Sequence, residues 1–308
     1  GCAILSIMVP DKDGKYANVV LSYGTLDALM HGPEPFLSTT IGRYGNRIAK
    51  GKFTLYGEEH SLTINNGPNS LHGGPTGFHA RVWDAEQLEE GVIRFNYTSA
   101  DGEEGFPGNL EVEMTYRLEE EENAIVIEYR ATTDKATVVN LTNHGFFNLA
   151  GTANPTPTVE NNIVTINADF YTPIDEVSIP TGEIAKVEGT PMDFRTPHTV
   201  GERINDKFQQ LIYGAGYDHC YVLNKAETGS LDLAATCKEP NSGRTMEVYT
   251  TEAGVQLYTG NWAASKEQTE LLSPHEALSA SKLNASPTHR IKHTSRRLLY
   301  CRAMNTSR

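Results

Sequence analysis

Long apolar runs are missing from this sequence of 308 residues. No stretch approaches the roughly 20 apolar residues of a membrane-spanning helix, and no signal peptide is visible at the start. Positive charge is also scarce, because 26 Lys and Arg stand against 39 Asp and Glu, for a net charge of -13. Nucleic acids and anionic membrane surfaces bind clustered Lys and Arg. We therefore expect neither of them as a partner.

Cysteine pairs with the CxxC spacing of a zinc or redox motif are also missing. The four cysteines are Cys2, Cys220, Cys237 and Cys301. We expect them to be buried free thiols, which favours a reducing compartment such as the cytoplasm. The chain opens at Gly1 without Met, inside a strand-like stretch at residues 2–9, so we expect upstream residues and the first strands to be missing. A removed targeting segment, and with it a periplasmic or secreted protein, stays open.

Short apolar runs dominate in place of long amphipathic helices, although residues 25–30 fit one short helix. These runs alternate or are rich in β-branched residues, and each is bounded by Gly, Pro, Asn or Asp. They cover residues 18–22, 92–97, 110–118, 124–132 and 162–166. This spacing predicts an all-β fold, a large antiparallel β-sandwich. No repeat or linker divides the chain, so we expect residues 1–262 to form a single domain.

The strand pattern disappears after Trp262. From residue 263 to residue 308, Ser, Lys, Arg, His and Leu follow one another without a period of 2 or 3.6. We therefore predict no strands there and treat residues 263–308 as an anomalous tail. A disordered polar tail is the simpler alternative.

The segment at residues 140–151, Asn-Leu-Thr-Asn-His-Gly-Phe-Phe-Asn-Leu-Ala-Gly, places an ionisable imidazole between an apolar run and a glycine-ended turn. The apolar run at residues 136–141 predicts a buried strand that delivers Asn143 and His144 to a sheet surface. Imidazole titrates near neutral pH, so His144 is either a hydrogen-bonded core residue or a proton-transfer group.

Four further stretches combine glycine, which lets the backbone approach a ligand closely, with polar groups suited to a ligand rich in hydroxyls. They are GRYGNRI at residues 42–48, LHGGPTGF at 71–78, GYDH at 216–219 and GVQLYTGNW at 254–262. Each has a purely structural explanation. Arg47 could form a surface ion pair, and His72 could simply lie in a turn. Asp218 could be a turn or cap residue, and Gln256 could be an amide at the edge of a sheet.

Together with residues 140–151 and the FYTPIDE and IPTGE motifs within residues 170–183, these motifs give the chain a resemblance to the aldose 1-epimerases, or galactose mutarotases. The resemblance runs from Gly1 to about Trp262. It implies a galactose mutarotase-like supersandwich with a sugar groove on one sheet. It also implies interconversion of the α and β anomers of galactose, glucose and related aldoses, with a free sugar as partner and no metal or cofactor.

Anomer exchange requires one proton to leave the C1 hydroxyl and another to reach the ring oxygen, so that the C1–O5 bond opens. Rotation about C1–C2 and reclosure then give the other anomer. A general acid and a general base must face opposite sides of the hemiacetal, and each contributes roughly 10²- to 10⁴-fold. By resemblance, His144 is the acid that protonates the ring oxygen, which implies an imidazolium near a carboxylate. His72 is then the residue that hydrogen-bonds the sugar beside that oxygen.

The same resemblance implies the substrate-binding residues. Besides His72, they are Asn46, Arg47, Phe146, Asp218 and Gln256. Phe146 stands where the family commonly has Tyr, so either a hydroxyl contact is lost there or only an aromatic wall is kept. The aromatic ring that stacks on the sugar is Phe146, Tyr171 or Trp262.

The family's general base, a glutamate near the C-terminus, has no counterpart in this sequence. Glu267, Glu270 and Glu276 lack its flanking residues. Codons allowed for residues 280–297, read in a shifted frame, encode FETECLPDSPNQAHFPS, which resembles the family's base segment. We therefore predict a frameshift shortly after Trp262, with the base encoded across the codons of Ser281 and Lys282. A chain with this tail is expected to lack the base and a closing strand and to be impaired.

Two alternatives belong to other functional classes. A sugar-binding protein without turnover would lack the base but keep the polar residues Arg47, His72, His144 and Asp218. A glycosidase needs two carboxylates roughly 5 to 9.5 Å apart around one bond. The resemblance places only Asp218 in the groove.

Overall fold

The computed structural model describes residues 1–153, 158–261, 276–279 and 293–303. Within these ranges the α-helices are α1 (Leu26–His31) and α2 (Gln209–Gly214), and the regular structure is otherwise almost all strand. No helix in the described ranges is both long and apolar enough to cross a membrane. The all-β prediction is confirmed. So is the short helix at residues 25–30, because the Thr25 side chain accepts the Ala28 amide at 3.2 Å and caps α1.

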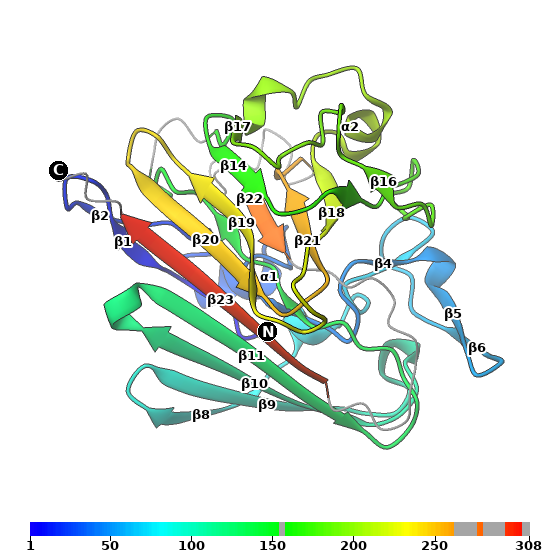
Figure 1. Ribbon diagram of the computed structural model, residues 1–308. Helices are drawn as coiled ribbons and strands as arrows, with labels where there is room; N and C mark the ends of the chain where they lie inside the picture. The colour runs from blue at the N-terminus through cyan, green and yellow to red at the C-terminus, as the bar shows by residue number, and fades with distance from the viewer. Residues whose placement is uncertain (154–157, 262–275, 280–292, 304–308) are drawn as a thin grey trace.

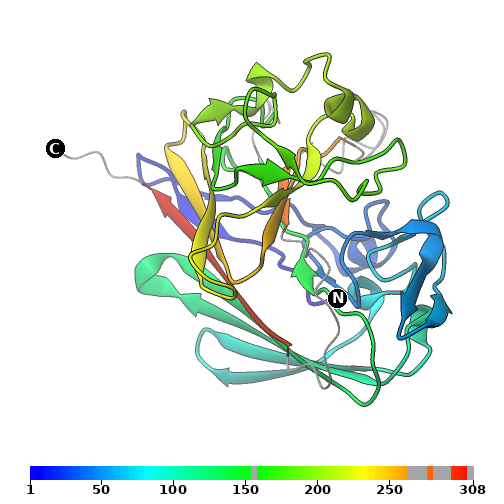
Figure 2. The same ribbon diagram turned by 45° about the vertical axis from the view of Figure 1, so that its right-hand side comes forward.

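Two antiparallel sheets form the molecule (Figures 1 and 2). The first contains β8 (Asp84–Glu89), β9 (Val92–Ser99), β10 (Leu110–Glu119), β11 (Ala124–Thr133), β14 (Ile163–Ile166), β17 (His198–Thr199), β19 (Asp232–Lys238), β20 (Arg244–Thr250) and β23 (His293–Ala303). Its nine strands are ordered β17-β14-β19-β20-β23-β11-β10-β9-β8. The second contains β13 (Phe146–Phe147), β15 (Phe170–Tyr171), β16 (Ala185–Lys186), β18 (Asp218–Val222), β21 (Gly254–Tyr258) and β22 (Glu276–Ser279). Its six strands are ordered β13-β22-β21-β18-β15-β16.

The sheets pack face to face over a shared apolar core. Val164 and Met246 from the nine-stranded sheet belong to the same buried cluster as Tyr221 and Val255 from the six-stranded sheet. Alternate side chains of a strand point to opposite faces, so one face of each strand supplies this core. The arrangement is the β-sandwich that the sequence predicts.

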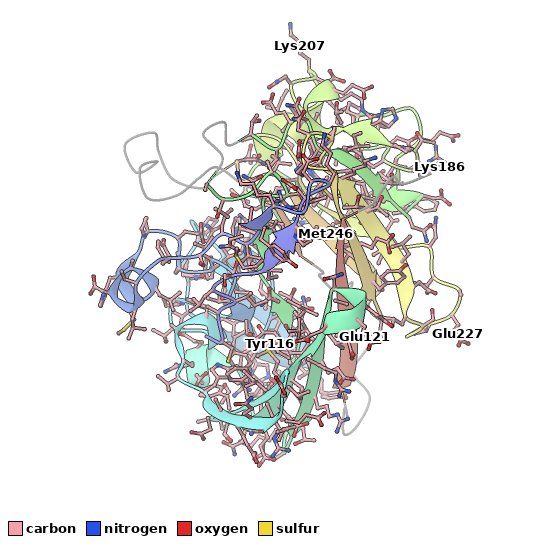
Figure 3. The ribbon with its side chains drawn as sticks, turned by 90° about the vertical axis from the view of Figure 1, so that its left-hand side faces the viewer. Tyr116, Glu121, Lys186, Lys207, Glu227 and Met246 are labelled. Atoms are coloured by element: carbon pink, nitrogen blue, oxygen red, sulfur yellow. The ribbon has the colours of Figure 1, made fainter. Side chains whose placement is uncertain are left out.

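A second cluster lies on the inner face of β10 and β11 and includes Leu110, Val112 and Met114. Tyr116, labelled in Figure 3, extends from the same strand. Its hydroxyl accepts the Asn143 side-chain amide at 3.0 Å. The large sheet therefore contacts the residue directly before His144.

Four short pairings outside the two sheets complete the fold. They join β1 (Met8–Pro10) to β2 (Tyr16–Asn18), β3 (Thr40–Ile41) to β12 (Thr142–Asn143), β4 (Arg47–Ile48) to β7 (Ser70–Leu71) and β5 (Lys52–Leu55) to β6 (Glu58–Ser61). The β3–β12 and β4–β7 pairs place the segments around Asn46, His72 and His144 next to the six-stranded sheet.

Four predicted runs, at residues 92–97, 110–118, 124–132 and 162–166, coincide with β9, β10, β11 and β14. Three others are wrong in extent. The run at residues 2–9 becomes a strand only from Met8, and the run at 18–22 only overlaps the end of β2. The predicted strand at 136–141 is absent, because the Asn140 amide and carbonyl bond to Arg43 and Gly45 rather than to a sheet strand.

The prediction that the tail lacks strands, including a closing strand, is wrong. β22 pairs with β21 and β13, and β23 fills the position between β20 and β11. Strands pair through their backbone N–H and C=O groups, and proline alone lacks the N–H. A segment can therefore join a sheet without an alternating pattern of apolar and polar side chains. Residues 281 and 282, where we expect the base to be encoded, lie outside the described residues.

Candidate functional site

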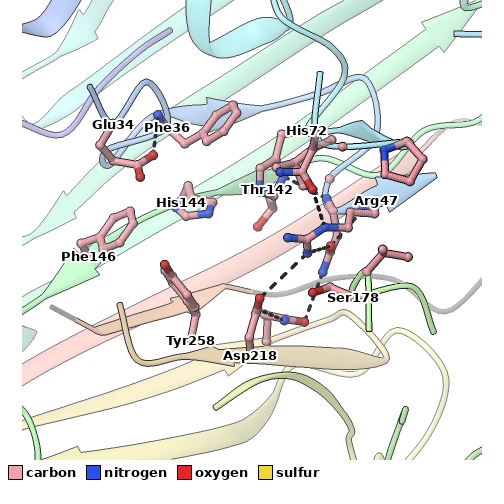
Figure 4. A pocket seen from close by; sticks show the side chains of 18 residues that line it. Glu34, Phe36, Arg47, His72, Thr142, His144, Phe146, Ser178, Asp218 and Tyr258 are labelled. Carbon is pink, nitrogen blue, oxygen red and sulfur yellow. Dashed lines mark hydrogen bonds and ion pairs between the residues drawn. The ribbon is translucent and has the colours of Figure 1, made fainter. Parts of the chain in front are cut away.

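All seven predicted site residues line one cavity of about 420 Å³ (Figure 4). They are Asn46, Arg47, His72, His144, Phe146, Asp218 and Gln256. Short strands and turns of the first 150 residues supply five of them, and β18 and β21 supply Asp218 and Gln256. Segments far apart in the sequence thus meet at one end of the six-stranded sheet.

A hydrogen-bonded polar network forms one end of the cavity, which we call the polar end. Gln256 donates its side-chain amide to Asp218 Oδ1 at 2.7 Å, and Asn46 donates to Gln256 Oε1 at 3.4 Å. Arg47 Nε donates to Asn66 Oδ1 at 2.9 Å, and Arg47 Nη1 lies 3.9 Å from Asp218 Oδ2. Amide, guanidinium and carboxylate groups held in fixed directions suit recognition of neighbouring hydroxyls.

Burial raises the pKa of Asp218, while the Arg47 guanidinium and the Gln256 amide act in the opposite direction. The pair Arg47–Asp218 is almost enclosed, since their side chains are 13% and 11% exposed. A sugar hydroxyl entering this end would therefore meet a weakly screened charge pair.

His72 has a defined tautomer. Its Nδ1 accepts the Asn46 backbone amide at 2.9 Å, so the ring proton of the neutral form is on Nε2. Burial lowers the pKa of His72 well below its ordinary value, and the neighbouring His144 and Arg47 act in the same direction. The neutral imidazole can therefore donate a hydrogen bond from Nε2, as the resemblance implies.

The backbone fixes His144 between β12 and β13. Its amide donates to the Thr39 carbonyl at 2.8 Å, and its carbonyl accepts the Ser38 amide at 2.9 Å. The residue is 8% exposed, and its Nδ1 is buried without a hydrogen-bond partner among the described residues. Burial lowers the pKa of His144 to about 4, so the imidazole is neutral at neutral pH.

Aromatic rings surround His144 and form the opposite end of the cavity, which we call the aromatic end. The ring centroid of His144 lies 5.0 Å from His72, 5.0 Å from Phe146 and 6.0 Å from Phe36. Tyr258 packs edge-on against Phe146 at 6.0 Å and also lines the cavity. These rings create the low-polarity surroundings that lower the pKa of the imidazole.

Of the three aromatic residues considered for sugar stacking, Phe146 lines the cavity. Tyr171 is 3% exposed and belongs to the core between the sheets, so it is not available for stacking. Trp262 lies outside the described residues.

Sequence reasoning missed six of the residues that line the cavity through their side chains. They are Glu34, Phe36, Asn66, Thr142, Ser178 and Tyr258. Tyr258 lies inside the GVQLYTGNW motif, so the motif offered a signal for it. Glu34 stands between two prolines shortly before GRYGNRI, and nothing in its local pattern distinguishes it from an ordinary loop acid.

The backbone is strained at three residues of the cavity wall. Asn46, His72 and Ser178 have φ values of 67°, 54° and 60°, in the left-handed region that side chains other than glycine rarely adopt. Such conformations concentrate where surrounding structure holds a functional group in place. The strain supports a binding role for this wall.

Within the described residues no group of three or more His, Cys, Asp or Glu is arranged to hold a metal ion. Cys237 is buried there, and Cys2 and Cys220 are half-buried. Of the three tail glutamates considered, Glu267 and Glu270 lie outside the described residues. The backbone of Glu276 pairs with Phe147 at the end of β22.

The fold and the cavity define a β-sandwich protein with a histidine-containing pocket suited to a ligand rich in hydroxyls. A family model described as aldose 1-epimerase matches residues 1–290. The match extends past Trp262, where the resemblance read from the motifs ends. The chain belongs to the aldose 1-epimerase family.

Named relatives agree with this assignment. The galactose mutarotase of Bos taurus is 45% identical over 262 residues, which cover 85% of this chain and 73% of the relative. The aldose 1-epimerase of Escherichia coli (strain K12) is 36% identical over 294 residues, which cover 94% of this chain and 83% of the relative.

Solved structures share the fold. The galactose 1-epimerase of Lactobacillus acidophilus is similar with a TM-score of 0.80 and 26% identity, over 96% of this chain and 88% of that one. An aldose epimerase homologue from C. elegans has a TM-score of 0.85 at 24% identity, over 98% of this chain and 93% of that one. The second comparison supports the fold alone.

Proposed function

We propose that this protein is an aldose 1-epimerase that interconverts the α and β anomers of free aldoses, with galactose and glucose as the first substrates to test. The observation that carries the proposal is the convergence of seven predicted residues on one cavity of about 420 Å³. The relatives are named as mutarotases and epimerases, which gives no support to a sugar-binding protein without turnover.

The polar end is suited to hold the sugar. Asp218 accepts hydrogen bonds from hydroxyls, and Arg47 and Gln256 donate them. Each hydrogen bond to a charged partner contributes about 1.5 to 3 kcal/mol. The Phe146 ring faces the less polar C–H surface of the sugar. These contacts leave C1 and the ring oxygen toward the histidines.

His144 exchanges a proton with the ring oxygen. The resemblance implies that it acts as the acid, which requires the imidazolium form. Because burial lowers the pKa of His144 to about 4, its imidazolium is scarce at neutral pH but is a stronger acid than an exposed one. His72 donates its Nε2 proton as a hydrogen bond beside the same oxygen and remains neutral.

Polarimetry of freshly dissolved α-galactose and α-glucose tests the proposal, with calorimetric binding measured in parallel. We expect the optical rotation to reach the same final value as in the protein-free solution, but faster. Binding without acceleration would favour the sugar-binding alternative and contradict the proposal. Release of nitrophenol from nitrophenyl glycosides would instead favour the glycosidase alternative.

We also propose that residues 263–308 are out of frame relative to the family and that the protein is cytoplasmic. The shifted translation of residues 280–297 supports the first point. The second is supported by the spacing of the four cysteines, which contains no CxxC pair. Resequencing the DNA together with an intact mass separates the two tails. If the gene and the mass both match this tail, a sequencing error is excluded. Recovery of the protein outside the cytoplasm would contradict the proposed cytoplasmic location.

A further inference from the structure

Asp218 lies where the pairing between two strands of the six-stranded sheet ends. β15 pairs with β18, and the last backbone hydrogen bond between their segments joins the Thr172 amide to the Cys220 carbonyl at 2.9 Å. Two residues further, the same register would place Ile174 opposite Asp218. The backbone amide and carbonyl of Ile174 bond instead to a side chain, so this last pairing does not form.

Two side chains take the place of the missing pairing. Gln210, from α2, accepts the Ile174 amide at 2.7 Å through Oε1 and donates to the Ile174 carbonyl at 3.0 Å through Nε2. The same Oε1 lies 3.1 Å from His219 Nε2, and His219 Nδ1 accepts the Asp218 amide at 3.1 Å. We call these contacts the side-chain bridge; its members are Ile174, Gln210, His219 and Asp218.

The imidazole of His219 has one tautomer in this bridge. Because Nδ1 accepts the Asp218 amide, the ring proton is on Nε2 and is donated to Gln210 Oε1. Burial lowers the pKa of His219 to about 3, so the ring is neutral at neutral pH. The residue is fully buried, and a Cβ added to Gly214 of α2 would lie 3.2 Å from its Cε1. The bridge is therefore closely packed as well as hydrogen-bonded.

The Ile174 end of the bridge is the base of a loop that reaches the cavity. Ile174 pairs with Pro180, and the Asp175 carboxylate accepts two amides of the loop between them at 3.0 and 2.9 Å. Ser178 belongs to this loop and lines the cavity together with Asp218 (Figure 4). Because the loop is bonded internally, a contact that holds its base also holds Ser178.

We propose that His219 and Gln210 are positioning residues that fix the Asp218 carboxylate for binding of the sugar. They also fix the loop that carries Ser178. The inference rests on the proposed function, because that function assigns Asp218 to a sugar site. The Gln256 amide holds the Asp218 side chain at 2.7 Å, and the bridge holds its backbone. A carboxylate that is already held in place loses less freedom when a hydroxyl binds to it.

The variant Gln210→Met breaks the bridge but keeps the length of the side chain. Methionine can neither accept the Ile174 amide nor take the hydrogen bond of His219. We expect KM for galactose to rise about 3- to 10-fold, which is roughly the worth of one ordinary hydrogen bond, with kcat changed by less than about twofold. The matched control is Gln209→Met, at the exposed preceding residue of α2, and it should retain both constants.

A double-mutant cycle distinguishes positioning from a general loss of structure. In an Asp218→Ala background no carboxylate remains to be positioned, so Gln210→Met should raise KM by less than about twofold. A residue with a merely structural role would raise KM by the same factor in both backgrounds. Calorimetric titration with galactose measures the same four affinities without turnover.

A second variant, His219→Phe, breaks the bridge at its other side chain and covers the case in which Gln210→Met folds poorly. Phenylalanine keeps an aromatic ring beside Tyr171, whose ring centroid lies 6.0 Å from that of His219, but it has no nitrogen. We expect the same rise in KM. Combining the two substitutions should add less than about twofold, because both break one bridge. Circular dichroism confirms that each variant is folded.

Three results separate this inference from the function on which it rests. If the wild-type protein accelerates mutarotation and both single variants keep its KM, the positioning role alone is overturned. Equal effects of Gln210→Met with and without the Asp218 carboxylate would overturn that role as well. If the wild-type protein binds galactose without accelerating mutarotation, the proposed function fails, and the four affinities still decide the role of the bridge.

Discussion

The two ends of the cavity differ in how their polar groups are satisfied. At the polar end, Arg47, Asp218 and Gln256 are bonded to one another or to neighbouring amides. At the aromatic end, His144 Nδ1 is buried without a partner among the described residues, and burial lowers the pKa of His144 to about 4. Satisfied groups hold their positions, whereas unsatisfied ionisable groups are ready to bind or exchange protons.

The two ends of the cavity are therefore expected to have different roles. The polar end should determine affinity, and the aromatic end should determine the rate of the chemical step. Substitutions at the two ends are then expected to separate KM from kcat.

The largest effect is expected from His144→Gln. Because the amide cannot transfer a proton, kcat should fall by roughly 10²- to 10⁴-fold, with KM changed by less than about threefold. Initial rates by polarimetry over a range of galactose concentrations measure both constants. His31→Gln is the matched control, since the His31 side chain is 66% exposed. A rise in KM at unchanged kcat would place His144 among the binding residues instead.

The next effect concerns pH. The pKa of His144 is about 4, so above this value the imidazolium fraction falls about tenfold with each pH unit. We expect kcat/KM, which reports the free enzyme, to decrease as pH rises from about 6 to about 8. Polarimetry at constant ionic strength, with buffer blanks subtracted, gives the profile, and a flat one would contradict an imidazolium acid.

A smaller effect is expected from Asp218→Asn at the polar end. Loss of the charge weakens hydrogen bonds to sugar hydroxyls and leaves Arg47 without its partner, so KM should rise about 10- to 100-fold. The kcat value should change by less than about threefold. Asp13→Asn, at an exposed turn, is the control. A fall in kcat with unchanged KM would remove the distinction between the two ends.

The smallest effect is expected from Asn66→Ala, one step away from the ligand. The variant loses the 2.9 Å hydrogen bond that orients Arg47 Nε. A typical intramolecular hydrogen bond contributes about 0.5 to 1.5 kcal/mol, and this one acts on the ligand only through the orientation of Arg47, so KM should rise by about 2- to 10-fold. Calorimetric titration with galactose checks the same change in affinity. An unchanged affinity would show that Arg47 is oriented without Asn66.

The strands β10, β11 and β14 were predictable because buried side chains recur at alternate positions along much of their length, and β9 because its run is rich in β-branched and aromatic residues. The apolar run at 136–141 was not, because Asn140 bonds to the loop around Arg43 and Gly45 rather than to a strand. The tail strands β22 and β23 were missed because their pairing depends on backbone groups next to existing edges. Apolar content alone does not distinguish these cases.

The residues of the site also include some that the sequence predicts and others that it does not. His72 and Asp218 lie in glycine-containing motifs, and their convergence follows from the resemblance. Glu34 could not be found, because it reaches the cavity only through a long-range pairing of its backbone with Tyr23. Sequence reasoning therefore expected one carboxylate in the groove, where the described residues supply two.

The most direct test of the account is a polarimetric progress curve of fresh α-galactose with the unmodified chain. We predict a first-order approach to the equilibrium rotation that is faster than the protein-free blank and proportional to protein concentration. A curve that superimposes on the blank at every protein concentration would contradict the proposed function and, with it, the division of the cavity into a binding end and a proton-transfer end.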